Sequence, residues 1–423
     1  MTGAAGMAAA TMPTAMTPFP GFDGLRLAAA LLVLVSHAMF TRAGAPPGDK
    51  LTQTLADAGV AGVFVFFIIS GFLLARSLDR EPDALRFAVN RVLRIYPGFV
   101  VCVLVTALVL GAAGSTLSPA AYFADGELLR HLRLTLECLC SNAWLPGVWN
   151  YQGDEAMRRV VNGSLWSLSA EVLSYLLLLA LWLLLRSVPA TVLALVGLTL
   201  ATRLSDSTFD RLAAVAFTLP YFVGGAVAYL VMRRWGVRTG VALACGAVVV
   251  LAAGAGHAAP ALATFGAYAL VWLGARDNPL SRLSMHTGDL SYGVYLYGWP
   301  VQQLVRVVSP SDSPWVTLAW SLPLTLACAW LSHRFVEAPA LRLKAPATAG
   351  LRRMVARTGG AARTGAQVAG ATVAIGALAL LIWPQPFWWW VTSSLLALAL
   401  VAALTAALAG WAGNRVSRKA SNR

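Results

Sequence analysis

The chain of 423 residues is 58% hydrophobic and only 12% charged, and it carries a net charge of +14 at pH 7. A typical soluble domain has about 25% charged residues, so this composition excludes an ordinary soluble protein. The basic residues stand between long apolar blocks, as they do in membrane proteins, and we therefore expect no nucleic acid partner.

The first segment, residues 1–20, is uncharged and rich in Ala, Thr, Met and Pro. It lacks the basic start of a signal peptide, and we expect a disordered N-terminal tail. The five cysteines are scattered through the chain without the Cys and His spacing of a zinc site. We therefore expect neither a metal nor a disulfide framework.

Long uncharged blocks rich in Leu and Ala follow, without period-two alternation. A membrane-spanning helix needs roughly 20 mostly apolar residues, whereas a barrel strand would alternate, so these blocks predict helices. We expect an all-α, polytopic integral membrane bundle with spans near 22–41, 58–76, 97–113, 165–185, 188–203, 211–232, 239–256, 258–274, 289–308, 314–333, 367–383 and 389–411. The seventh and eighth spans share one uncharged run, which Gly254, Gly256 and Pro260 are expected to divide.

The distribution of basic residues predicts the orientation. With the N-terminus in the cytoplasm, 22 of the 32 Lys and Arg residues fall in cytoplasmic connections and nine fall outside. This asymmetry predicts that the N- and C-termini are both cytoplasmic.

The first span contains three ionisable residues, Asp23, Arg26 and His37. Such residues are costly inside lipid and often mark function. Asp23 and Arg26 are three residues apart and can pair. Arg26 and His37 are eleven residues apart, which places them on one helix face about 16 Å apart along the axis. His37 could act as a general base, or it could be a structural histidine at the outer interface.

Two further spans contain polar groups. Glu171 enters an apolar helix, where it could form an ion pair with a buried arginine or orient His37 or a substrate hydroxyl. Ser70 and Gly71 permit close helix packing. The ninth span is aromatic and polar for lipid, and we expect Tyr295 and its neighbours to face a cavity.

The connection after the second span brings Arg91 and Arg94 side by side at three-residue spacing. Paired arginines suit phosphate binding, but they also suit ordinary anchoring at the cytoplasmic surface. We expect structural roles for the remaining ionisable residues near the membrane, which are His131, His257, His286, Asp289, His333 and Glu337.

The outer loop, from about residue 114 to 163, contains Trp144, Trp149 and Tyr151. These aromatic side chains could stack on a sugar, or they could pack or form an interfacial belt.

Six segments, taken in order, resemble the transmembrane acyltransferase-3 family. They are FDGLRLAAALLVLVSH, FVFFIISGFLLA, FAVNRVLRIYP, NGSLWSLSAEV, LSYGVYLYGWPV and HRFVEAP. The resemblance implies a ten-helix acyltransferase domain over residues 21–342. Residues 343–366 would then be a basic cytoplasmic linker, residues 367–411 two additional transmembrane helices, and residues 412–423 a basic cytoplasmic tail.

The resemblance also implies acyl transfer from acetyl-coenzyme A (acetyl-CoA) or another acyl-CoA to a glycan or glycoside. His37 matches the essential histidine of the family, and Arg26 with His37 matches its Arg-x10-His signature. Arg91 and Arg94 match its paired-arginine motif, and Glu171 matches the acidic residue of its LWSLxxE motif. We expect His37 and Glu171 to be catalytic and Arg26, Arg91 and Arg94 to bind the donor. We expect Asp23, Ser70 and Tyr295 to support the substrate or the structure.

Two alternatives stay open from the residues alone. One is a transporter or flippase for a lipid-linked saccharide, and the other is a non-catalytic membrane scaffold. The two additional helices could dock an envelope-assembly partner.

Overall fold

The computed structural model describes residues 19–40, 48–138, 144–149, 160–204, 213–277, 279–309, 311 and 313–357. Within this part the chain is helical, and an isolated bridge between Ser115 and Val148 is its one β pairing. The predicted eleventh and twelfth spans and residues 412–423 lie outside the described residues, as does nearly all of residues 1–20.

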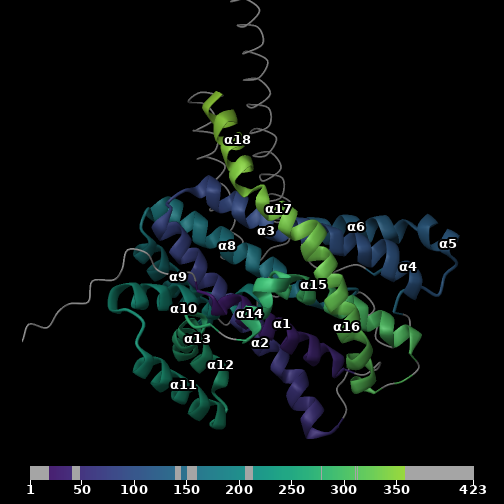
Figure 1. The fold of residues 1–423 in the computed structure, drawn as a ribbon, viewed down its shortest axis with the longest axis horizontal. Coiled ribbons are helices and arrows are strands. Elements are labelled where there is room, and N and C mark those ends of the chain that lie inside the picture. Colours follow the sequence, from purple (N-terminus) through teal and green to yellow (C-terminus); the bar gives the residue numbers. More distant parts are fainter. Residues whose placement is uncertain are drawn as a thin grey trace, which may run out of the picture.

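Ten helical segments correspond to the ten predicted core spans (Figure 1). In chain order they are α1 (Gly21–Ala38), α2 (Lys50–Arg80), α3 to α4 (Ala84–Gly114, through η1 at Thr106–Leu110), α8 (Trp166–Leu185, preceded by η2 at Gly163–Leu165), α9 (Val188–Leu204), α10 (Ala213–Trp235), α11 (Thr239–Gly254), α12 to α13 (Ala258–Gly274, through η3 at Leu262–Gly266), α15 (Ser291–Val308) and α16 (Pro314–Ser332). The remaining helices are α5 (Pro119–Ala124), α6 (Gly126–Cys138), α14 (Pro279–Thr287), η4 (His333–Glu337), α17 (Ala338–Arg342) and α18 (Lys344–Arg357).

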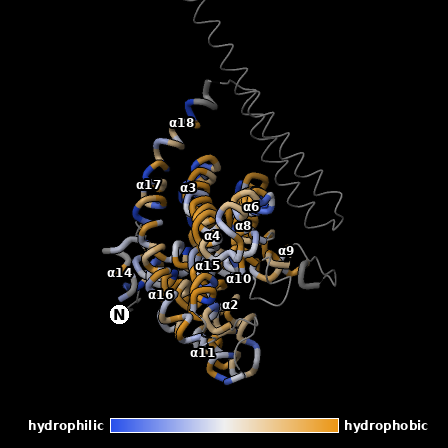
Figure 2. Tube along the Cα trace, turned by 90° about the vertical axis from the view of Figure 1, so that its right-hand side faces the viewer, coloured by the Kyte–Doolittle hydropathy of each residue, from blue (hydrophilic) through white to orange (hydrophobic). Residues whose placement is uncertain are grey.

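Six helices of the described part are long and apolar enough to cross a membrane. They are Gly21–Ala38, Lys50–Arg80, Ala84–Gly114, Gly163–Leu185, Ala213–Trp235 and Pro314–Arg353. Three shorter apolar helices lie among them. Figure 2 shows hydrophobic residues along most of the bundle and hydrophilic residues on α17 and α18. The chain is a multi-pass, all-α membrane protein.

The uncharged run of the seventh and eighth spans divides where the sequence predicts. Helix α11 ends at Gly254, Gly256 adopts a positive φ of 79°, and α12 begins at Ala258. A glycine with positive φ is the usual way to end a helix, because no Cβ opposes that conformation.

The third span begins earlier than predicted. Pro97 was expected near its start, but α3 begins at Ala84, and Pro97 lies inside the helix. Asp83 caps the helix by accepting a hydrogen bond from the backbone amide of Arg86 at 3.1 Å. The first turns of α3 are regular helix, but they contain so many arginines that a search for apolar segments does not detect them.

The core is formed mainly by α2, α8 and α10, and α2 packs on α10 and on α1. The α2–α10 contact depends on two glycines, Gly71 and Gly225. A Cβ at Gly71 would overlap the backbone carbonyl of Phe222, and one at Gly225 would overlap that of Ile68. Small residues at such positions allow two backbones to approach closely, as in other membrane helix pairs.

The outer loop carries its own small core. Trp149 and Tyr122 are fully buried, and Tyr122 donates a hydrogen bond to the carbonyl of Ala107 at 2.6 Å. Trp144 donates to Glu127 at 3.0 Å. Trp149 therefore packs inside the protein and is not available for sugar stacking, whereas Tyr151 lies outside the described residues.

Residues 344–357, at the start of the predicted linker, form the helix α18. It extends beyond the rest of the described bundle and packs on α3 (Figure 1). Its sequence, KAPATAGLRRMVAR, is charged and has few large apolar residues. The apolar periodicity that indicates a helix is therefore weak in this segment.

Candidate functional site

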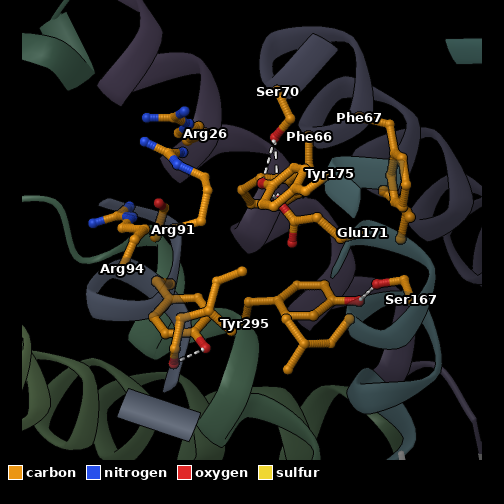
Figure 3. Close-up of a pocket in the computed structure, with 15 residues that line it drawn as sticks. Arg26, Phe66, Phe67, Ser70, Arg91, Arg94, Ser167, Glu171, Tyr175 and Tyr295 are labelled. Atoms are coloured by element: carbon orange, nitrogen blue, oxygen red, sulfur yellow. Dashed lines mark hydrogen bonds between the residues drawn. The ribbon is translucent and has the colours of Figure 1, made fainter. Parts of the chain in front are cut away.

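One pocket brings together six of the residues predicted for the site (Figure 3). Arg26 comes from α1, Ser70 from α2, Arg91 and Arg94 from α3, Glu171 from α8, and Tyr295 from α15. Three guanidinium groups gather on one side of this pocket, and the carboxylate of Glu171 lies among the aromatic side chains. We call it the arginine pocket. Its space amounts to about 60 Å³, which holds roughly four water molecules.

The two arginines of α3 have different surroundings. Arg94 forms an ion pair with Asp289, whose other oxygen accepts a hydrogen bond from the backbone amide of Ser291 at 3.1 Å. Glu337, which is buried, accepts a hydrogen bond of 2.8 Å from the Ser332 hydroxyl. Asp289 thus has the structural role that was expected of it, because it holds Arg94 in place.

Arg91 forms no hydrogen bond or ion pair with the described residues. Its guanidinium carbon stands 5.9 Å from the centre of the Tyr175 ring, and its Nε is buried without a hydrogen-bond partner there. The carboxylate of Glu171 attracts it, and the charges of Arg26 and Arg94 repel it. A buried cation without a hydrogen-bonded anion is costly, so this position is suited to an anionic ligand.

Arg26 forms an ion pair with Asp23, with 3.7 Å between Nη1 and Oδ1, as their spacing predicts. The Asp23 side chain is 53% exposed, whereas that of Arg26 is 19% exposed. Asp23 therefore lies at the rim and balances Arg26 from outside the pocket.

Glu171 is held by neutral hydrogen-bond donors. Its Oε1 accepts hydrogen bonds from the Tyr175 hydroxyl and, at 3.2 Å, from the Ser70 hydroxyl. It forms no ion pair in the described part of the chain, and it stands in the arginine pocket instead of beside His37. Close helix packing accounts fully for Gly71. It does not account fully for Ser70, because the Ser70 hydroxyl also contacts the Glu171 carboxylate.

Tyr295 closes one side of the arginine pocket. Its hydroxyl shares a hydrogen bond of 2.5 Å with that of Ser167, and its ring lies edge-on to Phe66 with 5.6 Å between centres. The expectation that the ninth span faces a cavity is confirmed for Tyr295 and Tyr292.

His37 lies apart from this pocket, near the opposite end of α1. Its ring packs edge-on against Trp299 of α15, with 4.9 Å between ring centres, and its Nδ1 is buried without a hydrogen-bond partner among the described residues. The arginine pocket and His37 are thus separate sites in this structure. Tyr295 lines the arginine pocket, and Trp299 contacts His37. These two residues are about one helical turn, or 6 Å, apart along α15.

The backbone around His37 is fixed by α15. Arg306 donates hydrogen bonds of 2.8 Å to the carbonyls of His37 and Phe40, and Gln302 donates one of 2.7 Å to the carbonyl of Leu34. Arg306 is only 4% exposed. The two bonds from Arg306 satisfy carbonyl groups at and just beyond the end of α1, where no further helical amide reaches them.

The loop before α8 holds the other side of Trp299. Asn162 donates a hydrogen bond of 2.9 Å to the carbonyl of Leu296 and accepts one of 3.1 Å from the amide of Ser164. A Cβ at Gly163 would fall 2.7 Å from the Trp299 ring, so only glycine permits this contact. The segment NGSLWSLSAEV therefore connects the His37 site to the arginine pocket.

Trp299 and Arg306 are site residues that the sequence does not single out. Arg306 stands near the predicted outer end of the ninth span, where an exposed charge is expected. Residues 299, 303 and 306 share one face of α15, and this polar stripe beside an aromatic ring was a usable signal. Within the part of the chain that the structure describes, no three His, Cys, Asp or Glu side chains gather as metal ligands would.

The chain is similar to several known proteins. The chain is 28% identical over 297 residues to an O-acetyl transferase of Shigella phage Sf6, covering 67% of this chain and 85% of the relative. It is 29% identical over 352 residues to nodulation protein 10 of Rhizobium leguminosarum bv. viciae, covering 76% and 93%. It is 25% identical over 380 residues to the acyltransferase MdmB of Streptomyces mycarofaciens, covering 78% and 94%.

No solved structure matches the chain significantly. The model of the acyltransferase-3 family, described as an acyltransferase domain, matches residues 19–334. This range includes every side chain of the arginine pocket and of the His37 site, and the chain therefore belongs to the acyltransferase-3 family.

Proposed function

We propose that this protein transfers an acyl group, acetyl in the first instance, from acyl-CoA to a hydroxyl group of a cell-envelope or exported glycan. The observation that carries the proposal is Arg91, a guanidinium without a hydrogen-bonded partner among the described residues, in a pocket that it shares with Arg26 and Arg94. Coenzyme A carries a diphosphate, and arginine binds phosphate through charge-assisted hydrogen bonds. The name of the phage relative, O-acetyl transferase, supports acetyl as the acyl group.

The proposed orientation follows from the positive-inside rule. The protein would lie in the bacterial inner membrane with its N- and C-termini in the cytoplasm. The arginine pocket would then face the cytoplasm, where acyl-CoA is found, and His37 would lie toward the outer leaflet. The acyl end of the donor would travel along α1, past Tyr295, over the roughly 16 Å that separates Arg26 from His37.

His37 is the proposed general base. It would take the proton of the acceptor hydroxyl, whose oxygen then attacks the carbonyl carbon of the thioester. The new ester C–O bond forms, the C–S bond breaks, and the proton passes from His37 to the departing thiolate of coenzyme A. An acyl-histidine intermediate is the alternative route through the same residue.

The test uses the full-length protein in inverted membrane vesicles, with radiolabelled acetyl-CoA outside and an envelope glycan fraction enclosed in the lumen as acceptor. We expect label in the glycan and release of free coenzyme A. His37→Gln should lower transfer by about 100-fold or more, the usual scale of general base catalysis, without loss of membrane assembly. Normal transfer by the assembled His37→Gln variant would remove His37 from the mechanism. Movement of a labelled lipid-linked saccharide across the membrane without release of coenzyme A would instead favour the flippase.

A further inference from the structure

A second polar hollow lies between α3 and α18. It has a volume of about 500 Å³, and Arg86, Asn90, Lys344 and Arg352 are among the residues that line it. Three of these side chains are cationic, and no described residue of the lining is acidic. We call it the α18 groove.

The groove is built from matched faces of two helices. Arg86, Asn90 and Arg94 recur every four residues on α3, which places them along one face about 6 Å apart. Residues 344, 348 and 352 recur in the same way on α18. The α3 face continues from the groove to Arg94, so the groove adjoins the arginine pocket.

The cations of the α18 groove and of the arginine pocket repel one another. Lys344 lies close enough to Arg91 and Arg94 to be repelled by both. Arg86 is paired with Glu81, at 2.6 Å, and Arg352 is paired with Asp83. Lys344 has no hydrogen bond or ion pair from its ammonium group to any residue in the described ranges. It is half-buried and is therefore the cation of the groove that remains open to an anion.

The nucleotide end of coenzyme A carries two kinds of phosphate group. One is the diphosphate, and the other is a separate phosphate monoester at the 3′ position of the ribose. A donor whose diphosphate meets Arg91 and Arg94, and whose acyl arm points into the bundle, extends its adenosine away from the arginine pocket. The α18 groove lies on that side, at the N-terminal end of α3. Its lining of cations and the Asn90 amide suits a phosphate monoester and a ribose.

We propose that the α18 groove binds the 3′-phosphoadenosine end of the donor, with Lys344 as the main contact of the 3′-phosphate. This inference rests on the proposed use of acyl-CoA. Lys344 follows the last residue, 334, of the region that matches the family model. Part of the donor site is therefore supplied by the segment that the sequence interpretation treats as a linker.

The test compares the binding of coenzyme A and of dephospho-coenzyme A, which lacks only the 3′-phosphate. The full-length protein would be placed in phosphatidylcholine nanodiscs and titrated by calorimetry. We expect the wild type to bind coenzyme A at least about tenfold more tightly than dephospho-coenzyme A, on the scale of one charge-assisted hydrogen bond. Lys344→Gln should weaken coenzyme A binding by about tenfold and leave dephospho-coenzyme A binding within about twofold.

The matched control is Arg353→Gln on the same helix. Arg353 is exposed and does not line the groove, so this variant should bind both ligands as the wild type does. Lys344→Arg, which keeps the charge, should restore most of the preference for coenzyme A. The thermal midpoint of each variant shows whether the fold is kept.

The outcomes separate this inference from the proposed function. A wild type that binds neither ligand contradicts the use of coenzyme A itself. A wild type that binds both, with a preference that Lys344→Gln leaves unchanged, overturns the α18 groove alone. The groove inference is also overturned if phosphatidylglycerol copurifies with the wild type but not with Lys344→Gln while coenzyme A binding stays equal, because Lys344 would then bind a lipid phosphate.

Discussion

The guanidinium of Arg306 donates a hydrogen bond of 2.8 Å to the backbone carbonyl of His37. The same Nη2 reaches the carbonyl of Phe40 at 2.8 Å, and Nη1 donates to Gln303 at 3.0 Å. A buried cation at the C-terminal end of α1 also interacts favourably with the helix dipole. The contact therefore fixes the residue proposed as the base through its backbone.

Replacing Arg306 by Leu should loosen the end of α1 and displace His37. Removing a partner of buried carbonyls costs about 1–3 kcal/mol, so the thermal midpoint should fall. We expect the rate of transfer to fall more than the affinity for coenzyme A, because the arginine pocket is untouched. Unfolding by differential scanning fluorimetry and a donor titration would measure both. The control is Arg130→Gln, whose side chain is 60% exposed in the outer loop and which should change neither.

Arg91 and Arg94 should respond differently to the same substitution. Arg94→Gln leaves Asp289 without its cation, and breaking a buried pair costs about 3–5 kcal/mol, so stability should fall. Arg91→Gln removes a cation without an ion-pair partner in the described residues, so stability should be kept or should rise, while coenzyme A binding weakens by about tenfold. Chemical unfolding and calorimetric titration would test this. Equal losses of stability for the two variants would contradict the distinction.

Glu171→Gln tests the carboxylate apart from its hydrogen bonds. The amide oxygen can still accept from Tyr175 and Ser70, so the fold should be retained. Removing a negative charge near Arg91 should tighten coenzyme A binding by roughly threefold, because the carboxylate repels the phosphates. If Glu171 takes part in proton transfer, turnover should fall by about 100-fold. A variant with wild-type turnover would restrict Glu171 to a structural role; Glu127→Gln in the outer loop is the control.

Gly71→Ala and Gly225→Ala should each destabilise the bundle, because each new Cβ would meet a backbone carbonyl of the facing helix. The backbones must separate, and overpacking of this kind costs about 1–3 kcal/mol or more. Gly246→Ala on α11 is the matched control, since nothing lies within 4 Å of its added Cβ. It should be neutral or stabilising, because alanine favours a helix by about 1 kcal/mol over glycine. Thermal midpoints in detergent would give the comparison.

The positions of the core helices could be predicted from the sequence, because long apolar blocks separated by charged connections indicate where helices lie. Gly254, Gly256 and Pro260 were sufficient to predict the break between α11 and α12. The arginine-rich start of α3 and the helix α18 could not be found in this way. Hydropathy does not detect a helix whose turns are charged, even where such turns line a groove.

The candidate site could be predicted only as a set of residue types. Costly polar groups inside apolar spans identified Arg26, Glu171 and His37. Which of them share a pocket depends on contacts between distant helices, such as Ser70 with Glu171 at 101 residues' separation. For the same reason Arg306 could not be identified from the sequence. The sequence around a charged residue at the end of a span is the same whether its side chain faces water or the end of another helix.

The glycine contact of α2 with α10 has a mechanical consequence for the arginine pocket. No side chain stands between the two backbones at Gly71 and Gly225, so no rotamer change can widen that seam. A cavity with room for roughly four waters must expand to admit a thioester arm. The expansion then falls to the walls supplied by α3, α8 and α15, which carry Arg91, Glu171 and Tyr295. The proposed phosphate ligands Arg91 and Arg94 are thus carried by α3, one of the walls that would have to move when the donor enters.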